Sequence, residues 1–533
     1  GYDLAHQHKG SVERGRPVRR PDLPLLLVAL LSLFAARPLL EPGFLDTHAY
    51  GDSPFLLFRV FELDRALRDG LWLARWSPDF AYGYGYPFFN FYAPLPYYVA
   101  EVFHLLGIGI PDSIRIVQLL ALFGSGFSMY FLARDLWGKW AGIVAAVTYV
   151  YVPYHLVNAY LRSDSLGEFA AYALFPAMLW SFRRLVLRPT LPRAAWGAVL
   201  LAALVLTHNV SALIFSPVLA VFVLFTVWRE KVSGNCASWS AAILLSGLAA
   251  GLGLALSAFF WVPALFERPY VHMESMTTGY FDFRGHFLSL ERLVSGDLMY
   301  NYGLDGRPVD GLPFRIGLAQ ALPLAAASIW LALLLLQARL RKGRGPANAS
   351  YAALFLVLSV AIAVLMTPVA TAAWEVVPLL PMVQFPWRLL ALWALAGSLV
   401  VGVLGGALWR YRWVGKAVVA TIVGGAIVSG TWGLLPQKMD VDEEELSARA
   451  VMGYEYVTSS IGSTVRYEYL PVGVKERPWA SGEAASVLRG EQVVAQGGGG
   501  MAVDVVEDRT QRKKVLVDSS SGGEVTFLTY FLP

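Results

Sequence analysis

Long apolar runs constrain this chain more than any other feature of its sequence. A helix that crosses a membrane needs about 20 predominantly apolar residues. Only 15% of the residues are charged, against about 25% in soluble domains. We predict spans near 23–40, 113–133, 139–153, 168–185, 193–208, 210–228, 238–262, 316–337, 350–370, 388–409 and 413–433. The predicted fold class is therefore an all-α polytopic membrane bundle of about eleven transmembrane helices, the shorter ones tilted or broken.

Lys and Arg are concentrated in alternate loops, and an excess of these residues is typical of cytoplasmic loops. The basic clusters are Arg14–Arg20, Arg134 with Lys139, Arg183–Arg193, Arg229 with Lys231, Arg339–Arg344 and Arg410–Lys416. If all of them are cytoplasmic, segment 1–22 lies inside and the tail lies outside. Counting 88–107 as a further span would put several of these basic clusters on the outer side of the membrane. We therefore expect an interfacial helix there.

The tail, 434–533, differs in composition from the apolar part of the chain. Residues 465–469 alternate apolar and polar side chains, as a half-buried strand does. Val515, Val517 and the run 525–532 predict further strands, and Gly497–Gly500 predicts a loop. We expect three parts: a basic segment 1–22, a transmembrane part 23–433 with a large outer loop 41–112, and a small β-rich extracytoplasmic domain 434–533. We also expect that Gly1 and Pro533 are not the natural ends.

Several chemistries are excluded or left without support. The one cysteine, Cys236, permits neither an intramolecular disulfide nor a cysteine-based zinc site. The formal charge of +4 gives no support for nucleic-acid binding. No Walker, GxGxxG, HExxH or GxSxG pattern occurs in its proper setting. Nucleotide use is therefore not expected, and energy would come from an activated substrate or a gradient.

The first outer loop is dense with polar residues. Asp46 follows the first span almost at once, where partial burial would raise its proton affinity and suit it to act as a general base. Asp52 is the rival, and both could instead be solvated acids or helix caps. His48 could ligate a metal with them, but the spacing is loose. A helix with one apolar side is predicted over 53–69 and carries Arg59.

Further polar groups follow the later spans at the same side of the membrane. Arg162 with Glu168 is either a structural ion pair or part of a phosphate site. His208 and Asn209 form either a self-contained turn or part of a site. Arg388, preceded by Gln384, lies in the first turn of a span, where a cation opposes the helix dipole and calls for an anion such as lipid phosphate, unless it only snorkels to headgroups.

Five sequence stretches carry a family resemblance. They are Arg75–Asp79, Gly83–Pro94, Thr207–Asn209, Gln384–Arg388 and Glu468–Pro471. Together they resemble a bacterial membrane-protein family labelled "6-pyruvoyl-tetrahydropterin synthase-related", which is similar to the GT-C glycosyltransferases. The resemblance implies transfer of a sugar from a polyprenyl-phosphate donor to an extracytoplasmic glycan, lipid or protein acceptor. It implies Asp46, or Asp52, as the catalytic acid, and it leaves metal use in doubt because this chain has Asp-Thr-His where other branches have paired acids.

The expected function is thus that of a membrane glycosyltransferase in a bacterial inner membrane. Tyr84, Tyr86 and Tyr92, in a ring-rich segment, would stack on the sugar and seat the prenyl tail. No cofactor is expected, and a divalent metal is left open. Two alternatives stand beside this hypothesis: a non-catalytic subunit of a membrane protein complex on a GT-C-like scaffold, and a lipid or polysaccharide transporter.

Overall fold

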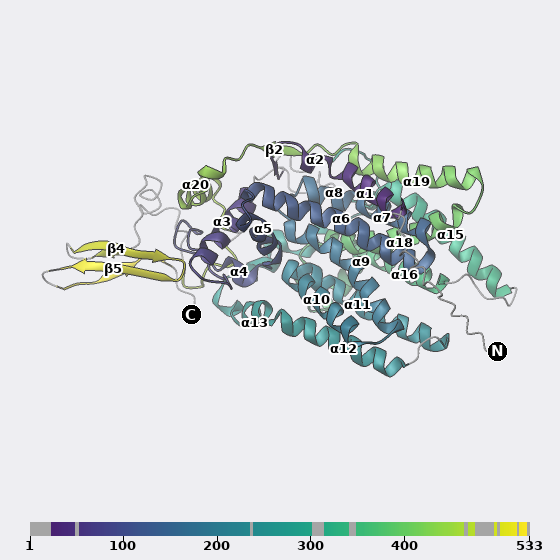
Figure 1. Ribbon diagram of the computed structural model, residues 1–533, viewed down its shortest axis with the longest axis horizontal. Helices are drawn as coiled ribbons and strands as arrows, with labels where there is room; N and C mark the ends of the chain where they lie inside the picture. Colours follow the sequence, from purple (N-terminus) through teal and green to yellow (C-terminus); the bar gives the residue numbers. More distant parts are fainter. Residues whose placement is uncertain are drawn as a thin grey trace, which may run out of the picture.

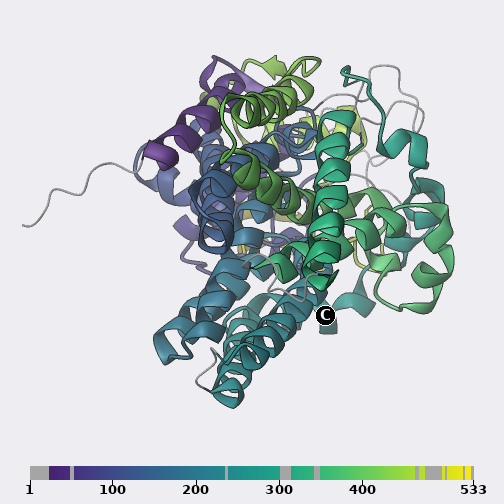
Figure 2. The same cartoon turned by 90° about the vertical axis from the view of Figure 1, so that its right-hand side faces the viewer.

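The computed structural model describes residues 23–47, 53–234, 238–300, 314–340, 348–462, 467–474, 495–497, 501–519 and 522–529. Most of these residues are helical, and the longer helices run side by side along the long axis of the molecule (Figure 1). Figure 2 views the same bundle turned by 90°. The fold class predicted from the sequence is confirmed in its helical character.

Six described helices are long and apolar enough to cross a membrane. They are α6 (Ile110–Trp137), α11 (Asn209–Val232), α12 (Trp239–Leu256), α15 (Leu318–Leu340), α18 (Leu390–Leu408) with its preceding turn η7 (Pro386–Leu389), and α19 (Trp413–Thr431). Two bent pairs could each form one more span: α7 (Lys139–Val150) with α8 (Pro153–Tyr160), bent by 48°, and α16 (Ala349–Leu365) with Pro368–Val376, bent by 87°. The remaining predicted spans are α1 (Leu23–Ala35), α9 (Leu166–Leu187) and α10 (Leu191–Thr207). Every predicted segment therefore coincides with a helix, whereas the count of eleven spans stays a prediction.

Two predicted spans end earlier than the sequence suggested. The predicted span 238–262 is interrupted at Ser257, whose hydroxyl donates to the Gly253 carbonyl, and α12 is followed by α13 (Ala258–Phe266). The second ends at Leu365 rather than 370. Thr367 precedes Pro368 and is extended, with φ −106° and ψ 160°, because a residue before proline avoids the helical conformation.

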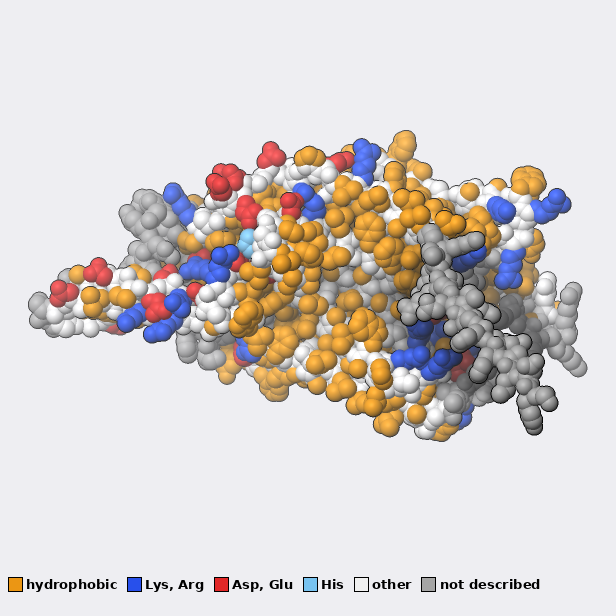
Figure 3. All heavy atoms as spheres, viewed as in Figure 1, with side chains coloured by type: hydrophobic (Ala, Val, Ile, Leu, Met, Phe, Trp, Pro, Cys, Tyr) orange, Lys and Arg blue, Asp and Glu red, His pale blue; other side chains and the backbone are white. Residues whose placement is uncertain are grey.

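Helix α18 lies at the centre of the bundle, and α12 and α15 lie at its periphery. The share of the apolar window that is buried is 89% for α18 but 22% for α12 and 17% for α15. Small residues allow α18 to approach α7 closely, since a Cβ on Gly402 would lie 2.7 Å from the Ala145 Cβ. The exposed apolar side chains cover the middle of the molecule (Figure 3), as expected of a surface that faces lipid.

One end of the bundle carries a second hydrophobic cluster, which we call the cap. It contains α3 (Pro54–Arg68), α4 (Phe88–Phe91), α5 (Leu95–Leu105) and α20 (Ala448–Thr458), with β1 (Phe44–Asp46) paired antiparallel to β2 (Gln437–Met439) beside it. Helix α5 is too short to cross a membrane, so the decision not to count 88–107 as a span is supported. Helix α3 confirms the helix predicted over 53–69. It is buried on most sides, Arg59 and Glu62 included, rather than having one apolar side.

The C-terminal region holds two strand pairs. Strand β3 (Ala495–Gly497) pairs with β6 (Val525–Phe527), and β4 (Ala502–Arg509) pairs with β5 (Arg512–Asp518) in a projecting hairpin (Figure 1). The strands predicted at Val515 and Val525 are confirmed. The strand predicted over 465–469 is wrong for its described part, because Tyr467 has φ 38° and the chain turns there. Residues 465–466 and 498–500 lie outside the described residues.

The short helices of the described chain connect these elements. They are α2 (Arg37–Leu40), α14 (Leu290–Leu293), α17 (Thr371–Val376), η1 (Arg268–Tyr270), η2 (Met273–Thr277), η3 (Gly279–Phe281), η4 (Phe283–His286), η5 (Pro368–Ala370), η6 (Pro381–Val383) and η8 (Glu443–Glu445).

The end of the bundle opposite the cap, which we call the basic end, gathers Lys and Arg (Figure 3). By the positive-inside rule we expect this end to face the cytoplasm. With Cys236→Ser as background, we expect a cysteine at exposed Lys416 to react with an impermeant thiol reagent only from the cytoplasmic side, and one at exposed Glu444 only from the opposite side. Labelling of both positions from the same side would contradict this orientation.

Candidate functional site

A single buried carboxylate organises the cap end of the bundle. Glu168 lies in the first turn of α9, where the helix dipole favours a negative charge, and it is only 4% exposed. Its Oε1 accepts hydrogen bonds from the hydroxyls of Tyr154 and, at 3.1 Å, Tyr172. Its Oε2 lies 3.9 Å from Arg162 Nη1 and 3.8 Å from Arg388 Nε. The two oxygens thus have separate roles, one fixing the carboxylate and one facing two cations.

Arg162 is held in a closed ring of polar contacts. Its Nη1 donates to Asn158 Oδ1 at 2.7 Å, and Asn158 Nδ2 donates to the Tyr172 hydroxyl. That hydroxyl donates to Glu168, which closes the ring through the ion pair with Arg162. Asn158 lies four residues after Tyr154 on α8, so both project from one face of that helix. We call Tyr154, Asn158, Arg162, Glu168, Tyr172 and Arg388 the Glu168 cluster.

Arg388 is aimed at this cluster by an unusual backbone conformation. Gln384 has φ 67°, which is uncommon for a residue with a side chain. The Gln384 Oε1 accepts from Arg388 Nη1 at 2.8 Å, and its Nε2 donates to the Met276 carbonyl at 2.8 Å. The Val383 carbonyl accepts from the same Arg388 nitrogen at 3.0 Å. The Gln384–Arg388 stretch singled out in the sequence therefore holds the Arg388 guanidinium in one orientation.

An aromatic stack lines the side of the cluster. The Trp387 ring lies 4.0 Å from that of Phe314 and 4.8 Å from that of Phe385. The guanidinium of Arg162 is 5.0 Å from the Trp387 ring, and that of Arg388 is 5.0 Å from the Phe385 ring. Cation–π contacts of this kind stabilise a cation without occupying its hydrogen-bond donors.

His208 stands beside Glu168 at the turn between α10 and α11. Its Nδ1 accepts from the backbone N–H of Ser211 at 3.2 Å, so the neutral ring carries its proton on Nε2. Burial lowers the pKa of His208 to about 4, and the nearby charge of Glu168 only partly opposes this. The close approach requires Gly167, because a Cβ there would lie 2.6 Å from the Thr207 carbonyl oxygen. Asn209 is exposed, and its side chain accepts from the Val210 N–H.

Asp46 lies at the end of β1 and is partly buried. The residues on both sides of it are bonded to the loop that follows Arg162. The Leu45 carbonyl accepts from Ser163 Oγ at 3.2 Å. The Thr47 hydroxyl donates to Asp164 Oδ1 at 3.0 Å and accepts from the Asp164 N–H at 3.2 Å. The first and second outer loops therefore meet within two residues of both Asp46 and Arg162.

Arg59 is located in an aromatic cage rather than at an open surface. It is fully buried, with its guanidinium 4.5 Å from the Phe88 ring and 5.1 Å from the Tyr92 ring. Its Nη1 donates to the Tyr97 hydroxyl at 3.0 Å. Burial opposes the charge, but Tyr97, Tyr92 and Asp164 outweigh it and raise the pKa of Arg59. Tyr92 also interacts electrostatically with Arg388, which links the cage to the Glu168 cluster.

The other tyrosines that the sequence singled out lie elsewhere in the cap. Tyr86 is fully buried, and its hydroxyl accepts from the Tyr469 N–H at 3.1 Å, so its ring offers no open face. The Tyr84 carbonyl accepts from Thr529 at 3.2 Å. His48 and Asp52 lie outside the described residues, so the metal hypothesis for them stays a prediction. Within the described ranges, no group of three His, Cys, Asp or Glu could hold a metal ion.

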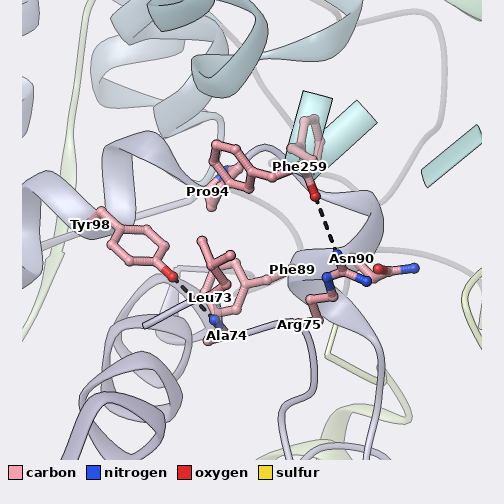
Figure 4. A pocket seen from close by; sticks show the side chains of 9 residues that line it. Leu73, Ala74, Arg75, Phe89, Asn90, Pro94, Tyr98 and Phe259 are labelled. Carbon is pink, nitrogen blue, oxygen red and sulfur yellow. Dashed lines mark hydrogen bonds between the residues drawn. The ribbon is translucent and has the colours of Figure 1, made fainter. Parts of the chain in front are cut away.

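A notch on the flank of the cap is separate from the Glu168 cluster (Figure 4). It is lined by Leu73, Ala74, Arg75, Phe89, Asn90, Pro94, Tyr98, Phe259 and Phe260. Asn90 Nδ2 donates to Glu267 Oε2 at 2.7 Å, and Arg75 lies 3.8 Å from the same carboxylate. These contacts hold α13 against the cap, whereas Asn90 Oδ1 is buried without a hydrogen-bond partner.

Sequence reasoning missed the residues that hold the cations in place. Asn158, Tyr172 and Phe314 had no distinguishing pattern, since each lies within or beside an apolar run. The spacing of Tyr154, Asn158 and Arg162, each four residues from the next, is the one signal that could have found part of the set.

Comparison with known proteins agrees with the resemblance predicted from the sequence. Residues 89–293, less than half of the chain, match the family model described as "6-pyruvoyl-tetrahydropterin synthase related domain; membrane protein". An uncharacterized protein of Lactococcus lactis subsp. cremoris is 26% identical over 246 residues, which cover 45% of this chain and 39% of that protein. The family resemblance and its membrane character are thereby confirmed.

Solved structures of similar fold come from two enzymes. The oligosaccharyltransferase AglB of Archaeoglobus fulgidus, in complex with an inhibitory peptide and a dolichol-phosphate, has a TM-score of 0.47 and 13% identity, covering 85% of this chain and 61% of that one. ArnT of Cupriavidus metallidurans, bound to undecaprenyl phosphate, has a TM-score of 0.44 and 14% identity, covering 95% and 99%. This chain thus spans about two fifths of the Lactococcus relative and three fifths of AglB. These likenesses concern the fold and identify no site residue.

Removing the central carboxylate should destabilise the fold. Glu168→Ala leaves two buried arginines without their counter-charge, and breaking a buried ion pair in this way costs about 3–5 kcal/mol. We expect a clear loss of thermal stability in detergent. The matched control is Glu375→Ala, which removes a carboxylate from an exposed pair with Arg284 and should change stability by less than about 1 kcal/mol. Equal effects of the two substitutions would contradict the central role of Glu168.

Proposed function

We propose that this protein is a membrane glycosyltransferase that moves a sugar from a polyprenyl-phosphate-linked donor to an extracytoplasmic acceptor. The observation that carries the proposal is the pair of arginines in the Glu168 cluster. Arg162 Nη1 and Arg388 Nε lie 3.9 and 3.8 Å from the same Glu168 oxygen, although the two arginines are far apart in the sequence. Guanidinium groups are well suited to bind the phosphate of such a donor.

The distances within the cluster favour a phosphate ligand over a closed structural ion pair. Glu168 Oε2 is 3.8 and 3.9 Å from its two cations, longer than the 2.7–3.2 Å of a hydrogen bond. The Glu168 oxygen therefore balances charge from beyond hydrogen-bond distance. Arginine donors match phosphate oxygens bidentately. His208, held neutral with its proton on Nε2, adds a donor that needs no counter-charge.

The reaction would be a single displacement with inversion. Asp46 takes the proton of the acceptor hydroxyl as its oxygen bonds to the anomeric carbon, and the bond from that carbon to the phosphate oxygen breaks. The electron pair leaves with the lipid phosphate, whose second negative charge Arg162 and Arg388 stabilise. The buried aromatic stack beside them holds both guanidinium groups in place. This scheme does not use a metal ion.

Asp46→Asn should reduce sugar transfer by at least about 100-fold, because a positioned general base contributes 10²–10⁴-fold. The assay follows release of lipid phosphate by mass spectrometry in liposomes that contain polyprenyl-phosphate-linked sugars and a membrane extract as acceptor source. Asp112→Asn is the control, since Asp112 is an exposed acid at the same end, paired with Arg115. Asp52→Asn is assayed in parallel. Full activity of both Asp46→Asn and Asp52→Asn would remove the proposed base.

Arg388→Gln should weaken binding of dolichol-phosphate or undecaprenyl phosphate by about 10–100-fold, since a hydrogen bond to a charged group is worth about 1.5–3 kcal/mol. Binding is measured on the purified protein. Arg75→Gln, which removes a half-exposed cation at the notch, should leave the Kd unchanged. Tight lipid-phosphate binding without any transfer by the wild type would favour the non-catalytic subunit. An unchanged Kd in Arg388→Gln would contradict the phosphate site.

A further inference from the structure

A buried cation at the basic end, Arg183, forms no ion pair within the part of the chain that the structure describes. Arg183 lies one turn before the end of α9 and is only 9% exposed. Its Nε is buried without a hydrogen-bond partner. Among the residues that the structure describes, no carboxylate forms an ion pair with it. Its contact there is with the Tyr351 ring, 5.8 Å from the guanidinium.

The neighbouring arginine shows what a satisfied cation looks like at this position. Arg229 of α11 lies 4.8 Å from the same Tyr351 ring. Its Nε donates to Ser350 Oγ at 3.0 Å, its Nη2 donates to Asn348 Oδ1 at 2.7 Å, and its Nη1 contacts Glu230. Glu230 is therefore already paired, and the excess positive charge of the group lies on Arg183.

The free energy of an unpaired buried charge calls for an anion. An isolated charge removed from water costs several kcal/mol. The C-terminal dipole of α9 offsets only part of this cost. The ring face of Tyr351 offsets a similar amount. Neither supplies a hydrogen-bond acceptor to the guanidinium.

The surroundings indicate that the anion belongs to a lipid. Two tryptophans at this end have a cation on their rings: Arg184 lies 4.8 Å from the Trp180 ring, and Lys231 lies 4.2 Å from the Trp239 ring. Tryptophan is enriched at the depth of the lipid headgroups, so these rings indicate that this end of the bundle lies there. Basic pockets between transmembrane helices on the cytoplasmic side bind anionic lipid headgroups. Figure 3 shows Lys and Arg gathered at this end of the molecule.

We propose that Arg183, which lies beside Tyr351 of α16 and near Arg229 of α11, binds the phosphate of an anionic phospholipid headgroup. The site lies at the end of the bundle opposite the Glu168 cluster and does not depend on the glycosyltransferase proposal. Its ligand is a structural lipid whose negative charge balances that of Arg183 between these helices.

The test compares the purified full chain in nanodiscs of phosphatidylcholine alone and with added phosphatidylglycerol. We expect phosphatidylglycerol to raise the Tm of the wild type and to be retained in native mass spectrometry. Arg183→Gln should weaken that binding by about 10-fold or more. Arg184→Gln is the matched control, since Arg184 is the next residue, exposed and stacked on Trp180, and should behave as the wild type. Arg183→Lys keeps the charge and should fall between the two.

Three outcomes would overturn the proposal. A wild type stabilised equally by both lipids would do so even if Arg183→Gln cannot be purified. Equal losses in Arg183→Gln and Arg184→Gln would assign the effect to general surface charge. If inorganic phosphate added to phosphatidylcholine nanodiscs stabilises the wild type as strongly as phosphatidylglycerol does, the ligand is free phosphate and the lipid assignment fails.

Discussion

The balance of charge around Glu168 is the interaction on which the cap end of this protein depends. Charged groups removed from water must be paired, and here one carboxylate serves two arginines from segments far apart in sequence. The tyrosine hydroxyls on its other oxygen prevent the carboxylate from rotating toward either cation. Glu168 can stand at this point only because Gly167 lets α9 approach the turn between α10 and α11. Local sequence, helix packing and electrostatics thus all determine the position of Glu168.

The cap also contacts the loops beside the Glu168 cluster. Strand β1 pairs with β2, which lies almost 400 residues later in the chain. Thr47 forms a hydrogen bond with Asp164, in the loop that carries Arg162. Glu455 of α20 accepts from the backbone N–H groups of Tyr82 and Gly462, while burial raises its pKa to about 8. The start of the tail therefore packs against the first outer loop, where Gln437 pairs with Asp46.

The sequence predicted the helices well because hydropathy reports directly on burial in lipid or protein, and every predicted span coincides with a helix. It predicted Glu168, Arg162, His208 and Arg388 as polar groups at one end, which the structure brings together. It could not predict Asn158 and Tyr172, whose role exists only in the folded contacts. The strand expected over 465–469 failed because alternation alone cannot reveal the left-handed turn at Tyr467. Arg59 was predicted as a binding residue, but an aromatic cage encloses it.

The two ends of the bundle solve the same electrostatic problem in different ways. Each places two arginines near one glutamate and aromatic rings. At the cap end the carboxylate lies between both cations beyond hydrogen-bond distance, so its charge is shared by Arg162 and Arg388. At the basic end Glu230 contacts Arg229 directly, so the charge of Arg183 is left over entirely. A shared counter-ion suits a substrate site because the empty state remains tolerable. An unshared one suits a site that is filled permanently, since the empty state there carries the full cost of a buried charge.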